Sequence, residues 1–186
     1  MRNDDTGKAI LVTGASGGIG ALSVRAPALA GHTVYAGIRQ MATRNATAVA
    51  DLVRHGTDHR VDVHAVELGV TSQDSADGAI DRVVTEHSRL DMVVHNAGHM
   101  VLGAAEAFAA EQFADLYDVN VLGTQRVNRA ALPKVRGQGS GLLVWIGSSS
   151  TRGGFRSLSR PRTSPPGPRW TTWASAWPRS SLRTPM

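Results

Sequence analysis

A glycine-rich segment near the start of the chain constrains the fold more than any other feature. This segment, TGASGGIG at residues 13–20, directly follows the apolar run 9–12 and opens a stretch with helical spacing. Glycine permits positive φ and lets the backbone approach a ligand closely. The free N–H groups of a helix's first turn, with the positive end of its dipole, then face an anion. A buried strand, spaced glycines and a helix therefore predict a site for the pyrophosphate of a dinucleotide.

Two other interpretations of this segment remain open at this point. Glycine-rich turns also close ordinary hairpins and cap helices. A mononucleotide P-loop is disfavoured, because Ala21 and Leu22 follow Gly20 where that motif carries its lysine.

The order of apolar and polar segments predicts the α/β fold class. Apolar or alternating runs predict five strands, at residues 8–13, 33–38, 61–68, 90–95 and 141–146. Helical spacing predicts helices over residues 18–30, 43–55, 71–88 and 104–137, the last of them broken near Tyr117-Asp118. Strands that alternate with helices imply right-handed crossovers and a doubly wound parallel sheet in three layers. Ligands of such sheets bind at the carboxyl ends of the strands.

The helical segments also carry predictions of which residues face inward and where a helix begins. In the first helix the apolar side is predicted to hold Leu22, Ala26, Leu29 and Ala30. The segment 71–74, Thr-Ser-Gln-Asp, predicts the N-terminal cap of the third helix.

Length and composition indicate a cytoplasmic protein with one main domain. The chain has 186 residues and no cysteine, which suits a reducing compartment. Residues 1–8 are polar and do not form a signal peptide, and no apolar run approaches the ~20 residues of a membrane helix. The net charge of +5 invites a nucleic-acid interpretation, but six of the 20 basic residues lie in residues 155–186. Without that tail 14 basic residues face 15 acidic ones, so we expect no nucleic-acid partner.

Residues 155–186 differ in character from the rest of the chain. They contain six Arg, six Pro, six Ser and three of the four Trp, with no acidic residue. The prolines forbid a helix and remove backbone donors from any strand. We therefore predict two parts, a domain at residues 1–154 and a tail at 155–186 that is disordered.

Four motifs in this order resemble the short-chain dehydrogenase/reductase family. They are TGASGGIG at 13–20, HNAG at 95–98, the VNVLG run that holds Asn120, and IGSSS at 146–150. The resemblance implies a Rossmann-type sheet that binds NAD(P) and passes hydride between the cofactor and an alcohol or carbonyl substrate. A different Rossmann enzyme, such as a methyltransferase, is disfavoured by the HNAG segment and by the helix that carries Asn120.

The resemblance also assigns the cofactor-binding residues. The expected set is Gly14, Ser16, Gly18, Ile19 and Gly20 in the loop, Arg39 after the second strand, Val70 after the third, and Asn96, Ala97 and Gly98 after the fourth. The family usually shows Asn where His95 stands, and we expect a conformational role to survive that change. It also usually has an Asp where Gly69 precedes Val70, so adenine binding should be weaker here.

The end of the second strand is where this family selects its cofactor. NAD enzymes of the family carry an acidic residue near the position of Gly37, and this chain has Arg39 two residues later. A guanidinium binds a 2′-phosphate through forked, charge-assisted hydrogen bonds, whereas a carboxylate would repel it. We therefore expect NADP rather than NAD. The alternative is a solvated surface arginine.

The resemblance places the catalytic serine at Ser148 and the asparagine of the proton relay at Asn120. The family's proton donor is a Tyr with a Lys four residues later, and no Tyr-x-x-x-Lys exists in this sequence. Matching forward from Ser148 puts these positions near Arg162 and Pro166. Arginine stays protonated and proline has no side-chain donor, so neither can replace them.

The composition of the tail suggests a cause, namely a frameshift near residue 154 that replaced the catalytic helix and all that follows. A natural disordered terminus is the alternative. We expect a sheet that is incomplete at its C-terminal end and lacks the helix that usually forms the family's dimer. The sequence thus predicts an NADP-dependent oxidoreductase with impaired chemistry, or a catalytically inactive nucleotide-binding protein. It expects no metal, and it leaves the identity of the alcohol or carbonyl substrate open.

Overall fold

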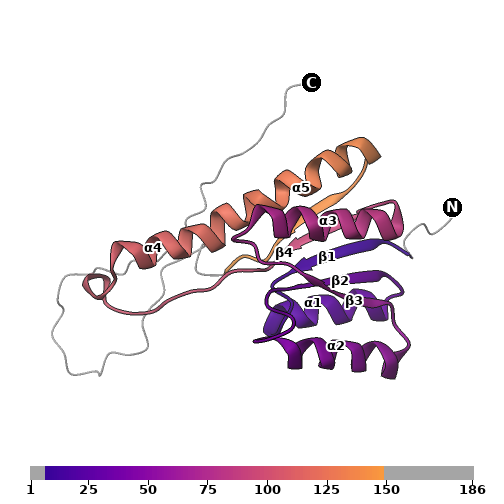
Figure 1. Cartoon of the computed structure of the whole chain (residues 1–186), viewed down its shortest axis with the longest axis horizontal. Coiled ribbons are helices and arrows are strands. Elements are labelled where there is room, and N and C mark those ends of the chain that lie inside the picture. The colour runs from indigo at the N-terminus through magenta and orange to yellow at the C-terminus, as the bar shows by residue number, and fades with distance from the viewer. Residues whose placement is uncertain (1–6, 149–186) are drawn as a thin grey trace.

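The five predicted apolar runs form parallel strands hydrogen-bonded in the order β3-β2-β1-β4-β5 (Figure 1). The strands are β1 (Ala9–Thr13), β2 (Thr33–Ile38), β3 (Val63–Glu67), β4 (Met92–His95) and β5 (Leu142–Trp145). This computed structural model describes residues 7–148. The predicted tail at 155–186 and the predicted absence of later strands lie outside the described residues.

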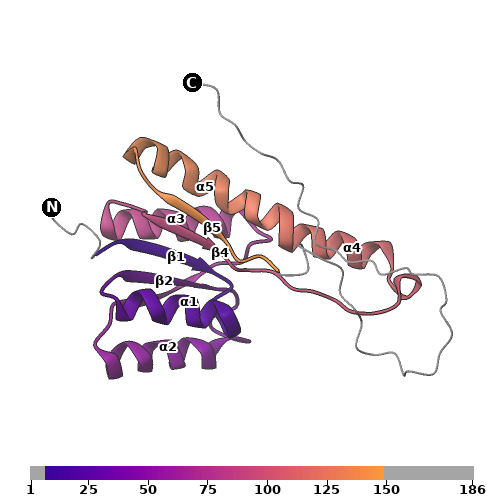
Figure 2. The same ribbon diagram turned by 180° about the vertical axis from the view of Figure 1, so that it is seen from behind.

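Helices connect these strands and cover both faces of the sheet (Figures 1 and 2). They are α1 (Gly18–Leu29), α2 (Ala46–His59), α3 (Gln73–His87), α4 (Ala110–Tyr117) and α5 (Gly123–Gln138), with a 3-10 turn η1 (Ala105–Ala107) and a π-helical turn η2 (Asp118–Leu122). α1 and α2 lie on one face, and α3 and α5 lie on the other, while α4 projects beyond the sheet. The predicted α/β fold and its three layers are confirmed.

The alternation of side chains along β1 builds a separate apolar core on each face of the sheet. Ile10 and Val12 join the core under α1 and α2, and Ala9 and Leu11 join the core under α3 and α5. All five residues of β1 are buried, because the strand is central and covered on both sides. The central position of β1 holds its C-terminal end in place, and the glycine loop begins at this end.

The structure corrects the predicted inner face of α1. The buried residues of this helix are Gly20, Val24 and Ala28, whereas Leu22 and Leu29 are 63% and 59% exposed. Small residues one turn apart let the helix lie close to the sheet, and the larger leucines then fall outside the contact. The prediction was wrong because the buried side of α1 and the side that holds Leu22 and Leu29 are both apolar. Residue spacing alone does not tell which of the two sides faces the sheet.

Two of the predicted helices, those at 43–55 and 104–137, also differ in their boundaries from the structure. α2 begins at Ala46 and continues past Gly56 to His59, later at both ends than predicted. The predicted break near Tyr117-Asp118 is a wide turn, because the Gly123 N–H donates to the Asp118 carbonyl, five residues back. The helix from α4 to α5 is thus continuous through η2. Such π turns occur frequently at functional sites.

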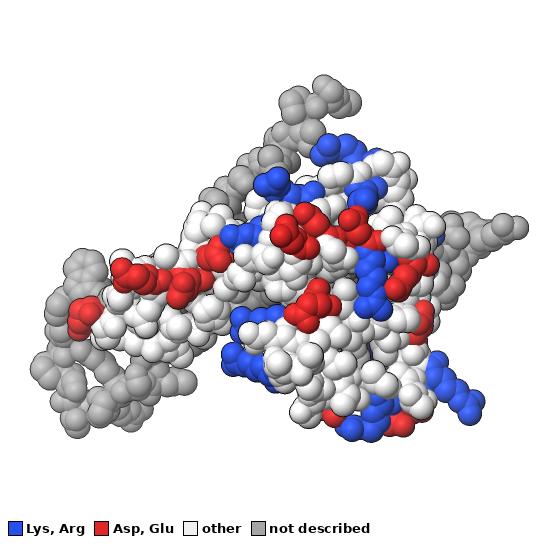
Figure 3. All heavy atoms as spheres, in the orientation of Figure 1, with Lys and Arg blue, Asp and Glu red and all other residues white. Residues whose placement is uncertain are grey.

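Over most of the face seen in Figure 3, basic and acidic side chains are interspersed. Acidic residues gather along α4 and its end, at Glu111, Asp115 and Asp118, while both signs alternate over α3 and α5. The described residues on this face therefore present no continuous basic surface.

Candidate cofactor-binding site

The glycine loop between β1 and α1 depends on glycine at Gly14 and Gly20, where an added Cβ would clash, and at Gly14 and Gly18, where φ is positive. Gly14 and Gly18 have positive φ angles, +65° and +54°. A Cβ at Gly20 would lie 2.3 Å from the Gly14 carbonyl oxygen and 2.5 Å from Asn96 Nδ2. The loop is thus folded tightly against the start of α1, which leaves the first-turn N–H groups of the helix directed out of the fold.

The outer side of this loop faces solvent. Ser16, Gly17 and Gly18 are exposed, and Ile19 in the first turn of α1 is 60% exposed. Ser16, Gly17 and Gly18 border a groove of about 410 Å³ between α1 and α2, which Arg25 and Asp51 also line. The first turn, Gly-Ile-Gly, carries no acidic side chain. Its amides and the helix dipole can therefore receive an anion.

Asn96 fastens the loop to the end of β4. Its Nδ2 donates to the carbonyl oxygens of Thr13 and Gly14, at 3.0 and 2.9 Å. The Thr13 hydroxyl accepts from the backbone N–H groups of Asn96 and Ala97, both at 3.0 Å. A Cβ at Gly14 would lie 2.7 Å from the Ala97 Cα. The structure therefore brings together the predicted loop and the predicted residues after β4, and it adds Thr13, which the sequence analysis missed.

His95 lies directly beneath this junction, at the end of β4. Its ring is 5% exposed, stacks on Trp145 at 4.9 Å between centroids, and shares a hydrogen bond of 3.0 Å between Nε2 and Asn128 Oδ1. Burial lowers the pKa of His95 to about 4, against the smaller opposing effect of the Asn128 hydrogen bond. The imidazole is thus neutral at neutral pH and acts as a packed polar group.

Arg39 follows the end of β2, at the same edge of the sheet. The residue is exposed, and among residues 7–148 its guanidinium makes no hydrogen bond or ion pair. A Cβ at Gly69 would lie 3.9 Å from the Arg39 Cβ, so the ends of β2 and β3 meet here. A guanidinium at this position, with no partner among the described residues, can bind an anion.

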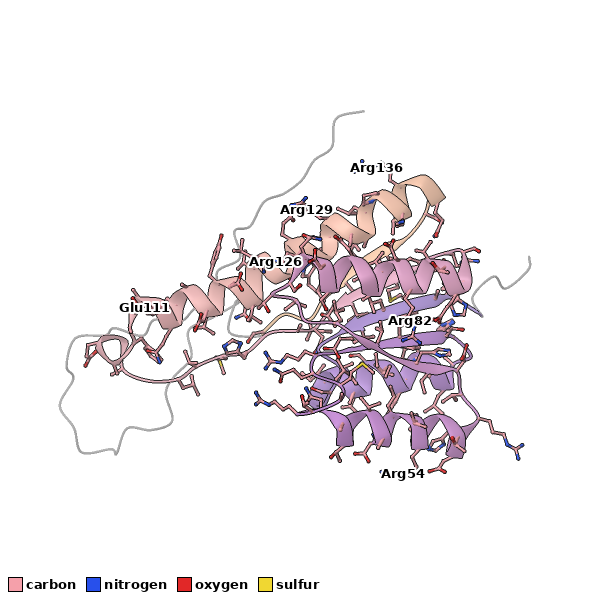
Figure 4. All side chains as sticks on the ribbon, in the orientation of Figure 1. Arg54, Arg82, Glu111, Arg126, Arg129 and Arg136 are labelled. Carbon is pink, nitrogen blue, oxygen red and sulfur yellow. The ribbon has the colours of Figure 1, made fainter. Side chains whose placement is uncertain are left out.

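Val70 packs against the start of α5. A Cβ at Gly123 would lie 2.8 Å from Val70 Cγ2, so only glycine permits this contact. Arg126, labelled in Figure 4, donates to the Val70 carbonyl at 3.3 Å and pairs with Asp118 at 2.6 Å. The segment after β3 is therefore held against the helix that carries Asn120.

Asn120 lies in the π turn and holds the segment that follows β4. Its Oδ1 accepts from the His99 N–H at 3.0 Å, and its Nδ2 donates to the His99 carbonyl at 2.9 Å. A Cβ at Gly98 would lie 3.0 Å from Asn120 Oδ1. Ser148 is exposed and lies just beyond β5, which pairs with β4. Both predicted catalytic residues thus lie beyond the carboxyl ends of these two strands.

The two tyrosines of the sequence, Tyr35 and Tyr117, both lie within the described residues. Positions 162 and 166, where the family places its Tyr and Lys, lie outside the described residues. Tyr35 is fully buried in β2, and its hydroxyl donates to Glu86. Burial and this hydrogen bond raise the pKa of Tyr35 far above its ordinary value, which makes it a weak acid. Tyr117 is 51% exposed at the end of α4.

The described part of the chain, residues 7–148, contains no candidate metal site and no candidate membrane span. No group of three or more potential metal ligands occurs among these residues. In the same part of the chain, no helix has the length and apolar character needed to cross a membrane.

Comparison with known proteins gives a consistent result. Residues 8–160 match the family described as short chain dehydrogenase. Human 17-beta-hydroxysteroid dehydrogenase type 1 is 32% identical over 142 residues, which cover 75% of this chain and 42% of that protein. Cyclopentanol dehydrogenase from Comamonas sp. (strain NCIMB 9872) is 30% identical over 141 residues, 76% of this chain and 54% of that protein. The chain spans about half the length of the curated relatives it matches.

Solved structures agree with these sequence relatives. A short-chain dehydrogenase from Streptomyces avermitilis superposes with a TM-score of 0.68 at 36% identity, and the match covers 77% of this chain and 50% of that one. Actinorhodin polyketide ketoreductase, in a structure with NADPH, superposes with a TM-score of 0.73 at 25% identity. That match covers 84% of this chain and 58% of the ketoreductase.

Proposed function

The chain belongs to the short-chain dehydrogenase family, and on that premise we propose that it binds NADP(H) at the site described above. Its ancestral reaction is hydride transfer between NADP(H) and an alcohol or carbonyl compound, and the chain itself turns over weakly or not at all. The loop at residues 13–20 is the main support for this proposal, because Gly20 leaves no room for a Cβ between the loop and Asn96. Only a backbone this close can present the first-turn amides of α1 to a pyrophosphate.

Each part of the site then has a role in holding the cofactor. Gly14, Gly18 and Gly20, with Ser16 and Ile19, receive the pyrophosphate, and Asn96 and Ala97 hold the loop in place. Gly98 continues this wall toward Asn120, and Val70 borders the adenine. The bound cofactor supplies or accepts the hydride. Ser148 positions the substrate oxygen, and Asn120 fixes the segment from 96 to 99.

The sequence contains no Tyr-x-x-x-Lys pair, so we expect the chain to bind the cofactor without reducing a substrate efficiently. A carbonyl that accepts hydride needs a proton donor within hydrogen-bond reach. Tyr35 cannot serve, because it is buried in the core against Glu86. The residues proposed to hold the nucleotide, in contrast, lie within 14–98, inside the described range of the chain.

The first test compares binding with turnover. The purified full chain is titrated with NADPH and then assayed for NADPH oxidation with a panel of small aldehydes and ketones. We expect saturable binding in the micromolar range, with oxidation at the rate of the protein-free control. Turnover above that control would show that the chain is an active reductase. A chain that does not bind NADPH would refute the proposal as a whole.

Arg39→Ala tests the choice of cofactor. Charge-assisted hydrogen bonds contribute about 1.5–3 kcal/mol each, so we expect NADP⁺ binding to weaken ~10–100-fold. NAD⁺ has no 2′-phosphate, and its affinity should change less than about threefold. Arg54→Ala is the matched control, since Arg54 lies on the outer side of α2, paired with Asp51 (Figure 4). Equal losses for both nucleotides, or no loss, would show that Arg39 is only a solvated arginine.

A further inference from the structure

The turn that follows β2, residues 39–45, is held by two side chains that the sequence analysis did not single out. Asn45 Nδ2 donates to the Arg39 carbonyl at 2.6 Å. Glu67 accepts from the backbone N–H of Gln40 at 2.6 Å through Oε1 and from that of Met41 at 3.0 Å through Oε2. The peptide that joins Arg39 to Gln40 is therefore bound on both sides, at its carbonyl and at its N–H.

This arrangement fixes an unfavourable backbone conformation. Gln40 has a φ of +52°, a left-handed conformation that is uncommon for a residue with a side chain. Such conformations persist where the surroundings determine them, and they cluster at ligand clamps. Here the side chains of Asn45 and Glu67 hold the peptide before Gln40, and the backbone N–H groups of Thr43 and Asn45 donate to the Gln40 carbonyl at 3.2 and 3.1 Å.

The position of Glu67 follows from the sheet register. Glu67 is the last residue of β3 and pairs with Ile38, the last residue of β2. Its carboxylate can therefore reach the first amides beyond β2. These amides are the groups that occupy both of its oxygens, and among residues 7–148 no arginine or lysine pairs with it. Glu67 therefore holds the turn next to Arg39, and within the described residues it forms no ion pair with the guanidinium.

We propose that Glu67 is a positioning residue for the adenosine end of the cofactor, and that it acts through Arg39. By binding the amides of Gln40 and Met41, its carboxylate holds the turn in the conformation from which the Arg39 guanidinium reaches a 2′-phosphate. Glu67 thus favours the phosphorylated cofactor even though its own charge is negative. This proposal rests on the proposed function, and it adds a second residue to the selection of NADP.

The test measures binding of the adenosine end alone. Adenosine 2′,5′-bisphosphate and AMP are titrated into wild-type protein and into Glu67→Ala, Glu67→Gln, Arg39→Ala and the double variant Arg39→Ala/Glu67→Ala. We expect Glu67→Ala to weaken bisphosphate binding about tenfold and to leave AMP binding within about twofold. Glu67→Gln keeps one acceptor oxygen and should fall between. In the Arg39→Ala background, Glu67→Ala should have no further effect.

Glu111→Ala is the control for net charge. It removes the same negative charge from an exposed position on α4, far from the turn (Figure 4). A local electrostatic effect would strengthen bisphosphate binding in Glu67→Ala and leave Glu111→Ala nearly unchanged, because salt screens distant exposed charges, whereas positioning predicts weaker binding in Glu67→Ala only.

The outcomes separate this inference from the proposal on which it rests. Tighter bisphosphate binding by Glu67→Ala would show that the carboxylate repels the phosphate, and an additive loss in the double variant would show that it acts apart from Arg39. Equal losses of bisphosphate and AMP would indicate only a loosened fold. Each of these results overturns the role of Glu67 alone. A wild-type chain that binds the bisphosphate no tighter than AMP overturns the choice of NADP as well.

Discussion

Gly20→Ala is expected to weaken NADPH binding at least ~100-fold, a loss of about 2.7 kcal/mol or more of binding free energy. The new Cβ would lie 2.3 Å from the Gly14 carbonyl oxygen and 2.5 Å from Asn96 Nδ2, closer than non-bonded atoms approach. One contact is backbone and the other is a side chain already bound to two carbonyl groups. Neither atom can move aside without opening the loop.

The same substitution should also destabilise the fold. Overpacking of a well-packed site costs about 1–3 kcal/mol, and here it would separate the end of β1 from the end of β4. Titration calorimetry gives the loss of binding, and urea unfolding gives the loss of stability. Circular dichroism of Gly20→Ala should still show the wild-type helix and strand content, so that the binding loss belongs to the site.

Gly78→Ala provides the matched control for this experiment. Gly78 lies in the interior of α3, where an added Cβ meets nothing within 4 Å. Alanine is a better helix former than glycine by up to ~1 kcal/mol, so the control should be as stable as wild type or more stable. Its NADPH affinity should be unchanged. If Gly20→Ala bound NADPH as tightly as Gly78→Ala, the loop would not be the pyrophosphate site.

The parts of the fold that depend on local pattern could be predicted from the sequence. β2 has the predicted bounds, since its β-branched and small residues stand between polar segments. Ser72 caps α3 by accepting from the Ser75 N–H at 3.2 Å, as the residues at 71–74 predicted. In both cases the cause of the structure lies within a few residues of its effect.

Contacts between distant segments could not be predicted in the same way. Thr13 meets Asn96 across 83 residues, and Glu67 meets Gln40 across 27. Nothing in their local sequence marks these side chains, because threonine in a strand and glutamate at a strand end are ordinary. The register of the parallel sheet brings the pairs together, and that register follows from the whole fold.

His95 shows how one substitution in a motif changes the physical properties of the site. The resemblance predicts that the conformational role of this position survives the change from Asn, and the structure places His95 in a hydrogen bond with Asn128. An asparagine does not titrate near neutral pH, whereas a histidine does. Burial in this position therefore gives the chain a dependence on pH that the usual residue would not confer.

The folded chain is expected to lose stability as the pH falls from 7.5 to 4.5. Burial lowers the pKa of His95 to about 4 in the folded protein, and an unperturbed histidine titrates near 6.5. Between these values the unfolded state binds a proton that the folded state excludes, so acid favours unfolding. The contribution of His95 is fully present above pH ~6.5 and is lost progressively toward pH ~4. Over the stated range it amounts to about 2.5 kcal/mol.

His95→Gln isolates this contribution. Glutamine can place an amide nitrogen near the Nε2 position that faces Asn128, and it does not titrate. Other groups also respond to acid, among them Glu86, whose pKa is lowered by its hydrogen bonds from Tyr35 and Arg82. These groups are common to both proteins, so the difference between the two pH profiles reports His95. Urea unfolding at pH 7.5 and 4.5 should show a loss about 2.5 kcal/mol smaller in the variant. Parallel profiles would mean that the folded protein accommodates a protonated imidazole between Trp145 and Asn128, and that His95 is not held neutral by burial.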